Sequence, residues 1–293
     1  MEGLLFKGIG GFYYVRCQES VYECRARGVF RKKGITPLIG DRVTIEPERE
    51  PGKATITEIL PRKNFLVRPP VSNIDQLFIV ASLQDPQPNP LIMDKTIAAA
   101  EYHGIEPVLI LNKTDLESGG ELAEIYRKAG ITCILASAQS GEGISEIRAM
   151  LRGKISAFTG NSGVGKSSIL NRVDSRLGLS TGEISQKLGR GRHTTRHVEL
   201  YELPDGGLVA DTPGFSTLDI ERFQVIRKEE LPRCFREFLP YLEQCRFTSC
   251  SHTVEKGCAV LLAVQEGKIP VSRHESYKAM YQEVKDLKEW NRK

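Results

Sequence analysis

The chain has 293 residues, of which 40% are hydrophobic, and a formal net charge of +4 at pH 7. This length predicts two or three domains, because single hydrophobic cores stop growing near ~250–300 residues. No apolar run approaches the roughly 18–20 residues of a membrane-spanning helix, which excludes an integral helical membrane protein. The chain has seven cysteines, an odd number, and no signal-peptide pattern precedes them. Both observations argue against a disulfide framework, so we expect a reducing, cytoplasmic environment.

Residues 1–63 predict a small β-barrel, because short runs of β-branched and aromatic residues alternate with glycines and no helical run interrupts them. An OB-like barrel that binds RNA is the functional interpretation, and a purely structural SH3-like or OB barrel is the alternative. Basic residues are densest between positions 25 and 33, where a solvated surface is the alternative to an RNA contact. These residues are Arg25, Arg27, Arg31, Lys32 and Lys33.

Residues 64–220 predict an α/β domain, which a linker at 61–70 joins to the barrel. The run 74–82 predicts the first strand of the sheet, and 93–103 predicts the helix that follows it. The apolar run 108–111 is typical of a parallel strand buried on both faces. Ligands of open α/β sheets bind beyond the carboxyl ends of such strands.

The segment Asn112-Lys113-Thr114-Asp115 follows this strand and predicts a guanine-binding site. The Asp115 carboxylate can accept two N–H donors from one edge of guanine, whereas adenine offers no matching pair. An ordinary turn is the alternative, because Asn and Asp also favour turns. A further strand at 131–136 ends in Ser137-Ala138, whose backbone N–H groups would meet guanine O6.

Residues 160–167 match the GxxxxGK(S/T) pattern of a phosphate-binding loop, with a strand-like run before them and a helical pattern after them. Lys166 would supply positive charge at the β- and γ-phosphates, and the Ser167 hydroxyl would ligate Mg²⁺. A chance Gly-rich turn is the alternative. The residues predicted to contact GTP are Asn112, Lys113, Thr114, Asp115, Ser137, Ala138, Gly160, Asn161, Ser162, Gly163, Val164, Gly165, Lys166, Ser167, Ser168 and Gly214.

Two later segments predict the switches of a nucleotide hydrolase. Residues 189–197 are rich in glycine and arginine, which suits a mobile switch, and Thr195, with Thr194 as the alternative, would place a second hydroxyl at Mg²⁺. A strand then ends in a DxPG segment, in which Asp211 would hold Mg²⁺ through water and the Gly214 N–H would sense the γ-phosphate. A simple turn is the alternative for this tetrapeptide alone.

In an ordinary GTPase the phosphate-binding loop precedes the guanine motif, and here the order is reversed. In this rotated order the chain resembles the circularly permuted GTPases of the RsgA (YjeQ/YloQ) type. The resemblance implies a zinc-binding helical domain after the GTPase domain. It also implies hydrolysis of GTP to GDP and phosphate late in 30S ribosomal subunit assembly, with 16S rRNA as partner and the subunit as activator. The matching motifs are 112–115, 137–138, 160–168, 191–195 and 211–214.

The catalytic group has no motif of its own in the sequence. Phe215 stands where a typical GTPase carries a water-orienting glutamine, so we expect slow turnover until a partner or a repositioned side chain completes the site. Lys166 and Mg²⁺ would supply most of the charge that stabilises phosphoryl transfer. The resemblance suggests His193 as the water-positioning group, and a solvated switch histidine or an RNA contact is the alternative.

Cys245, Cys250, His252 and Cys258 form a Cys₃His set suited to one structural Zn²⁺ in residues 221–293. Four protein ligands leave no open position for catalysis, and their spacing matches that of the RsgA family. Scattered thiols beside a surface histidine are the alternative, and Cys234 is the rival ligand. The apolar spacing near the C-terminus predicts a helix that packs on its own domain, with an rRNA contact as the alternative.

The charge distribution favours a polyanionic partner at the flanks. The net charge is +4 in residues 1–63 (12 basic, 8 acidic), −3 in 64–220 (15 basic, 18 acidic) and +3 in 221–293 (14 basic, 11 acidic). We expect a monomer without membrane contacts that binds GTP and GDP. Three functions compete: a 30S assembly GTPase, a non-catalytic RNA-binding module with GTP as a structural ligand, and a GTPase acting on tRNA or the large subunit.

Overall fold

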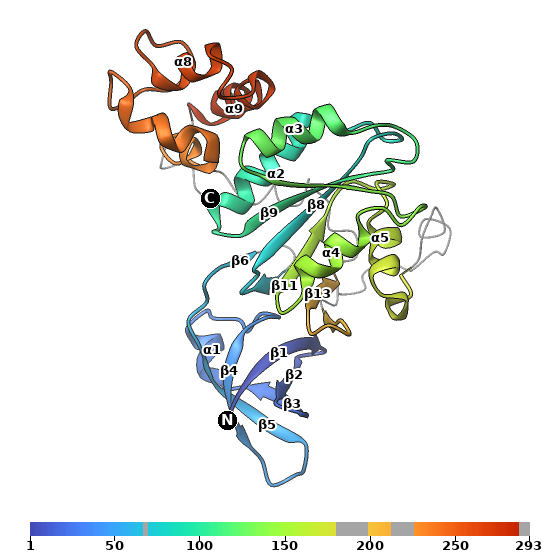
Figure 1. Ribbon diagram of the computed structural model, residues 1–293. Helices are drawn as coiled ribbons and strands as arrows, with labels where there is room; N and C mark the ends of the chain where they lie inside the picture. The colour runs from blue at the N-terminus through green and yellow to red at the C-terminus, as the bar shows by residue number, and fades with distance from the viewer. Residues whose placement is uncertain (67–69, 180–198, 212–225, 287–293) are drawn as a thin grey trace.

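The structure, a computed structural model, describes residues 1–66, 70–179, 199–211 and 226–286. Figure 1 shows a barrel at one end, a sheet flanked by helices in the middle and a group of helices at the other end. This architecture confirms the predicted fold class of barrel, α/β domain and mostly helical C-terminal region. No helix within the described ranges combines the length and apolar character needed to cross a bilayer.

The N-terminal strands form a closed barrel, because β1 pairs with both β2 and β4. The order β1-β2-β3-β5-β4 fits an OB fold, the five-stranded Greek-key barrel. A helix of five residues, α1 (Gly28–Lys32), lies between β3 and β4, although the sequence predicted no helix there. Phe30 is its one buried side chain, so α1 has too little apolar periodicity to be recognised. The strands are β1 (Glu2–Ile9), β2 (Phe12–Cys17), β3 (Ser20–Ala26), β4 (Arg42–Pro47) and β5 (Lys53–Ile59).

The central sheet has the order β10-β9-β8-β11-β13-β12, in which the first five strands are parallel and β12 is antiparallel to β13. Every residue of β8 is buried, as expected for a strand covered on both faces. The strands are β8 (Gln76–Ser82), β9 (Glu106–Asn112), β10 (Thr132–Ala136), β11 (Ile155–Thr159), β12 (Glu199–Glu202) and β13 (Leu208–Asp211).

Helices cover both faces of this sheet. Leu77 and Ile79 of β8 belong to the same core as α2 and α3, whereas Phe78 and Val80 belong to the core with α4 and α5. Helix α2 begins earlier than the predicted 93–103, because the Asn89 side chain caps it by accepting from the Ile92 N–H (3.2 Å). The helices are α2 (Pro90–Tyr102), α3 (Gly120–Lys128), α4 (Ile144–Leu151), α5 (Lys166–Val173) and the short 3₁₀ helix η1 (Ser175–Leu177).

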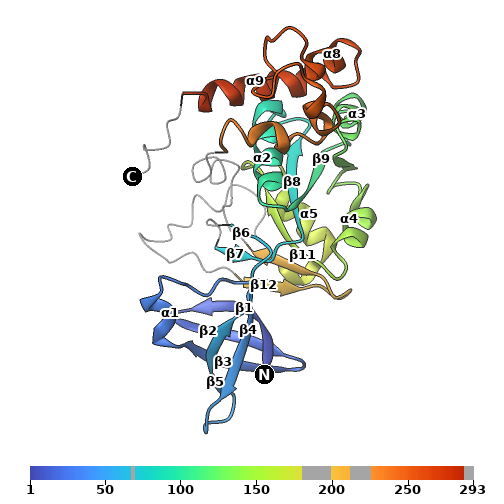
Figure 2. The same cartoon turned by 90° about the vertical axis from the view of Figure 1, so that its left-hand side faces the viewer.

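The barrel and the central sheet are joined edge to edge. Strand β1 pairs antiparallel with β12, with Lys7 opposite Glu199, and Figure 2 shows the two strands side by side. The Lys7 Nζ lies 2.9 Å from a Glu199 carboxylate oxygen, and Arg16 forms an ion pair with Glu202. The barrel therefore contacts the strand that immediately follows residues 180–198.

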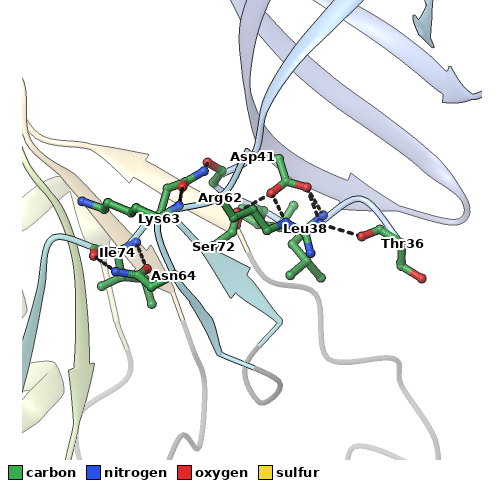
Figure 3. A network of polar contacts seen from close by, with 11 residues as sticks. Thr36, Leu38, Asp41, Arg62, Lys63, Asn64, Ser72 and Ile74 are labelled. Atoms are coloured by element: carbon green, nitrogen blue, oxygen red, sulfur yellow. Dashed lines mark hydrogen bonds and ion pairs between the residues drawn. The ribbon is translucent and has the colours of Figure 1, made fainter. Parts of the chain in front are cut away.

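The segment between the barrel and the central sheet, predicted as a plain linker, is held to the barrel by side-chain hydrogen bonds (Figure 3). The fully buried Asp41 carboxylate accepts hydrogen bonds from Arg62 Nε and Nη2 (both 2.7 Å) and from Ser72 Oγ (2.6 Å). The Asn64 amide exchanges two 2.8 Å hydrogen bonds with the backbone of Ile74. These bonds hold the short strands β6 (Phe65–Leu66) and β7 (Val71–Ser72), of which β6 lies within the predicted linker 61–70.

The C-terminal helices dock on α2. Arg273 of α9 is 1% exposed, and its guanidinium donates to Asp94 of α2 (2.6 Å) and to Glu237 (2.7 Å). Tyr277 and Met280 are buried in the core of this region, which confirms the predicted packing of the last helix on its own domain. The elements are η2 (Leu231–Cys234), η3 (Arg236–Gln244), α8 (Ala259–Gln265) and α9 (Val271–Val284).

Candidate nucleotide and metal sites

The phosphate-loop segment lies at the centre of the sheet, between the end of β11 and the start of α5. Strand β11 pairs with β8 on one side and with β13 on the other. From β8 the chain continues to β9, and from β11 it continues toward β13, so the two connections leave in opposite directions. Open α/β sheets bind ligands at such a switch point, and the N-terminus of α5 adds a partial positive charge there.

Glycines let the loop approach its neighbours closely. A Cβ atom on Gly160 (φ 149°) would lie 2.3 Å from the Val80 carbonyl oxygen. A Cβ atom on Gly165 (φ 93°) would lie 2.2 Å from the Asn112 Nδ2. Both distances are far inside van der Waals contact, and both φ values favour glycine. The loop therefore depends on glycine at these two positions.

The Lys166 side chain folds back over the preceding residues of the phosphate loop. Its Nζ donates to the carbonyl oxygens of Gly160 (2.5 Å) and Asn161 (2.9 Å). Burial lowers the pKa of Lys166 to about 8. Phosphate oxygens would favour the charged amine and offer stronger acceptors than these carbonyls. Ser167 and Ser168 follow in the first turn of α5.

The side chain of Asn112 joins the phosphate loop to residues 137–143, the loop between β10 and α4 that carries Ser137 and Ala138 and is called the guanine loop below. Asn112 is 2% exposed, and its Nδ2 donates to the Val164 carbonyl oxygen (2.8 Å). Its Oδ1 accepts from the backbone N–H of Ala138 at 3.3 Å. The three predicted segments 112–115, 137–138 and 160–167 thus meet at one edge of the sheet.

The rest of the Asn-Lys-x-Asp segment is fixed by side-chain contacts. The Ser137 hydroxyl donates to a carboxylate oxygen of Asp115, which ties together the two segments predicted to bind guanine. Lys113 adopts φ 71° and donates from Nζ to the carbonyl oxygens of Gln84 (2.9 Å) and Asp85. This arrangement places the Asp115 carboxylate and the phosphate loop on the same side of the sheet.

Two side chains outside the predicted set also hold the guanine loop. The Thr114 hydroxyl donates to the Glu142 carboxylate, and Arg172 of α5 donates to the carbonyl oxygens of Ala138 and Gln139. Thr114 and Glu142 are 28 positions apart, and Arg172 and Ala138 are 34 positions apart. No local sequence pattern links residues so distant, so only the folded chain reveals these contacts.

The remaining predicted nucleotide residues are not described. His193, Thr194, Thr195 and Gly214 lie outside the described residues, as does the predicted switch 189–197. Asp211 ends β13 and pairs through its backbone with Glu199. Of the three predicted Mg²⁺ ligands, the structure therefore describes Ser167, in the first turn of α5, and the backbone of Asp211, at the end of β13.

The four predicted zinc ligands converge in the C-terminal region. Their ligand atoms all lie within 4.8 Å of one another, and Cys234 does not belong to the group. The Cys245 and Cys258 sulfurs are 3.8 Å apart, and each lies 3.5 Å from His252 Nδ1. Tetrahedral ligands at a Zn–S distance of about 2.3 Å are separated by about 3.8 Å. The geometry therefore fits a tetrahedral metal and argues against scattered thiols.

The environment of this cluster favours a bound cation. Burial lowers the pKa of His252, which keeps the imidazole in the neutral form that ligates metals. Burial raises the pKa of Cys250 to about 12, and a cation would offset the cost of forming its thiolate there. The loop is held from α9, because His274 Nε2 and the Tyr277 hydroxyl donate to the carbonyl oxygens of His252 and Ser251, both at 2.8 Å.

Family models match almost the whole chain. The model described as the RsgA N-terminal domain matches residues 2–56, and the RsgA GTPase model matches residues 59–221. A third model, described as a 50S ribosome-binding GTPase, matches residues 155–292. This third match starts at the strand before the phosphate loop, which is where an unpermuted GTPase domain begins. Strands β8–β10 precede that point in this chain, so they fall outside the match.

Curated relatives are similar over nearly their full length. The small ribosomal subunit biogenesis GTPase RsgA of Caldanaerobacter subterraneus subsp. tengcongensis is 50% identical over 289 residues, covering 98% of this chain and 96% of that protein. The protein of the same name from Bacillus anthracis is 43% identical over 293 residues, covering 98% of each.

Two solved structures share the fold. YjeQ from Thermotoga maritima matches with a TM-score of 0.83 and 35% identity, over 98% of this chain and 99% of that one. YloQ, described as a circularly permuted GTPase, matches with a TM-score of 0.81 and 35% identity, over 98% and 96%. These matches agree with the permuted strand order that the sheet shows.

Replacing Gly165 with alanine should weaken GDP binding by at least about tenfold, because the new Cβ would displace the Asn112 amide from its position between the loops. A fluorescent GDP analogue measures this affinity by titration. Gly206→Ala is the matched control, because Gly206 also has a positive φ (81°) but has open space around its Cβ position. Wild-type affinity in Gly165→Ala would contradict the close approach described above.

Replacing Cys250 with serine should remove most of the zinc from the purified protein, because three ligands hold the ion less tightly than four. Elemental analysis by mass spectrometry measures zinc per chain, with about one expected for the wild type. Cys234→Ser should keep its zinc, because its thiol lies outside the cluster. Full zinc content in Cys250→Ser, or its loss in Cys234→Ser, would refute the assignment.

Proposed function

The chain belongs to the RsgA GTPase family and is a GTP hydrolase, and from that premise we propose that it acts in biogenesis of the small ribosomal subunit. The observation that supports the nucleotide site is the Asn112 amide, whose two hydrogen bonds hold the Ala138 segment beside the phosphate-binding loop. Relatives at 43–50% identity carry the name small ribosomal subunit biogenesis GTPase RsgA, which supports the 30S subunit and its 16S rRNA as partners.

The nucleotide would be read at both ends. The Asp115 carboxylate accepts N–H donors from the guanine edge, and the Ala138 N–H meets O6. At the other end, the loop 160–165 and the helix N-terminus receive the phosphates, and Lys166 turns from its carbonyl partners to the phosphate oxygens. An adenine base would leave the Asp115 carboxylate without its donors, which costs about 1–3 kcal/mol or more.

Ser167, Thr195 and Asp211 are the residues that would hold Mg²⁺. The bound ion would neutralise charge on the phosphates during transfer. Phe215 supplies no hydrogen bond to a water molecule, so a different group must orient the attacking water. We assign this role to His193. Since the protein lacks the usual glutamine, turnover without the subunit should be slow.

Each flank would have its own role. We divide the chain into three domains, 1–63, 64–220 and 221–293. The end of β5 at Ile59 and the family matches over 2–56 and 59–221 support this division. The barrel would contact rRNA with cationic groups stacked on aromatic rings, such as Arg25 over Phe12 (4.9 Å to the ring centroid). The cluster of Cys245, Cys250, His252 and Cys258 would hold one structural Zn²⁺. We further propose that the protein works as a cytoplasmic monomer.

Purified 30S subunits should raise GTP turnover by roughly tenfold or more, which corresponds to about 1.4 kcal/mol or more of barrier lowering. Phosphate release measured with 30S, 50S or tRNA separates the candidate partners. Lys166→Ala should abolish stimulated turnover and serves as the inactive control. Equal stimulation by 50S or tRNA would contradict the small-subunit assignment. Absence of turnover with every partner would instead favour a non-catalytic RNA-binding module.

A further inference from the structure

Arg172 connects the helix of the phosphate loop to the guanine loop. It lies in the last turn of α5, the helix that begins at Lys166. Its Nε donates to the Ala138 carbonyl oxygen and its Nη2 donates to the Gln139 carbonyl oxygen, both at 2.8 Å. A planar guanidinium bound to two successive carbonyls fixes both the position and the orientation of that segment.

The end of α5 that carries Arg172 is itself held in place. Arg148 of α4 donates from Nη2 to the carbonyl oxygens of Val173 (2.8 Å) and Arg172 (3.2 Å). Ile169 and Val173 of α5 are buried in the same core as the helix α4. The Arg172 guanidinium therefore extends from a fixed point of the scaffold.

The guanine loop is held from the other side by Ser137. The Ser137 hydroxyl oxygen accepts from the backbone N–H groups of Gln139 (3.1 Å) and Ser140 (3.0 Å). The Ala138 N–H instead points to Asn112 Oδ1 at 3.3 Å, the long end of the hydrogen-bond range. A carbonyl oxygen of a bound base can share or take over this donor at little cost.

We propose that Arg172 is a positioning residue for recognition of a 6-oxopurine base: it holds the Ala138–Gln139 segment so that the Ala138 N–H faces O6. This role rests on the proposed guanine site. It also makes base recognition depend on the helix that carries the phosphate-binding Lys166. Because the Arg172 side chain is exposed, its hydrogen bonds compete with water and the expected effect is moderate.

Base analogues distinguish positioning from general stabilisation. Arg172→Ala should weaken GDP binding by about 3- to 10-fold, the range of one or two exposed hydrogen bonds. Inosine diphosphate keeps O6, so its affinity should fall by the same factor. 6-Thio-GDP has a weakly accepting sulfur at this position, so its affinity should change less than about twofold. The preference of the wild type for GDP over 6-thio-GDP should therefore shrink in the variant.

Two further variants complete the test. Arg172→Lys keeps a charged donor and should recover part of the preference, although it lacks the two-pronged geometry. Arg176→Ala is the control, because Arg176 is also exposed just after α5 but pairs with Asp174, and its base preference should match the wild type. Equal weakening of GDP and 6-thio-GDP by Arg172→Ala, or no weakening of either, would overturn the proposal. A wild-type protein that binds no GDP would refute the proposed function itself, a distinct result.

Discussion

The side-chain amide of Asn112 donates one hydrogen bond from its nitrogen and accepts another at its oxygen, and this pair joins the two predicted halves of the nucleotide site. The nitrogen binds the Val164 carbonyl in the phosphate loop, and the oxygen binds the Ala138 N–H in the guanine loop. An aspartate would offer no donor to Val164, and an unpaired buried carbonyl costs about 1–3 kcal/mol. The absence of a side chain at Gly165 leaves room for this amide. One buried group therefore links the segment predicted to read the base to the segment predicted to bind the phosphates.

This arrangement explains how the permuted chain brings its Asn-Lys-x-Asp and phosphate-loop segments together. The carboxyl ends of parallel strands lie at one edge whatever order the chain visits them in, so β9, β10 and β11 deliver their loops to the same place. Permutation instead changes which elements of the α/β domain lie next to the N-terminal barrel and the C-terminal region in the chain. The barrel joins the sheet through β1 and β12, and the C-terminal region joins it through Arg273 of α9 and Asp94 of α2. Both flanks thus contact elements of the GTPase domain directly.

Much of this organisation is predictable from the sequence. The strand before the Asn-Lys-x-Asp segment, β9, is buried from Pro107 to Asn112, so its residues 108–111 appear as a continuous apolar run. Helix α1 was missed because it buries one side chain. The segment predicted as a linker contains β6, which pairs with β7, and the hydrogen bonds of Asp41 and Asn64 that hold these strands join residues not adjacent in sequence. The structural roles of Arg172, Glu142 and Arg273 were also missed, because their hydrogen-bond partners are brought close only by tertiary packing. The metal cluster was predictable because its four ligands lie within 14 consecutive residues, 245–258.

The central claim is that one purine nucleotide bridges segments that are distant along the chain. A crystal structure of the GDP complex tests it most directly. We expect the guanine edge on Asp115 and the Ala138 N–H, the diphosphate on Lys166 and the loop before it, and an intact bond between Asn112 and Val164. A diphosphate held by the loop while the base lies away from residues 112–115 and 137–138 would contradict the account.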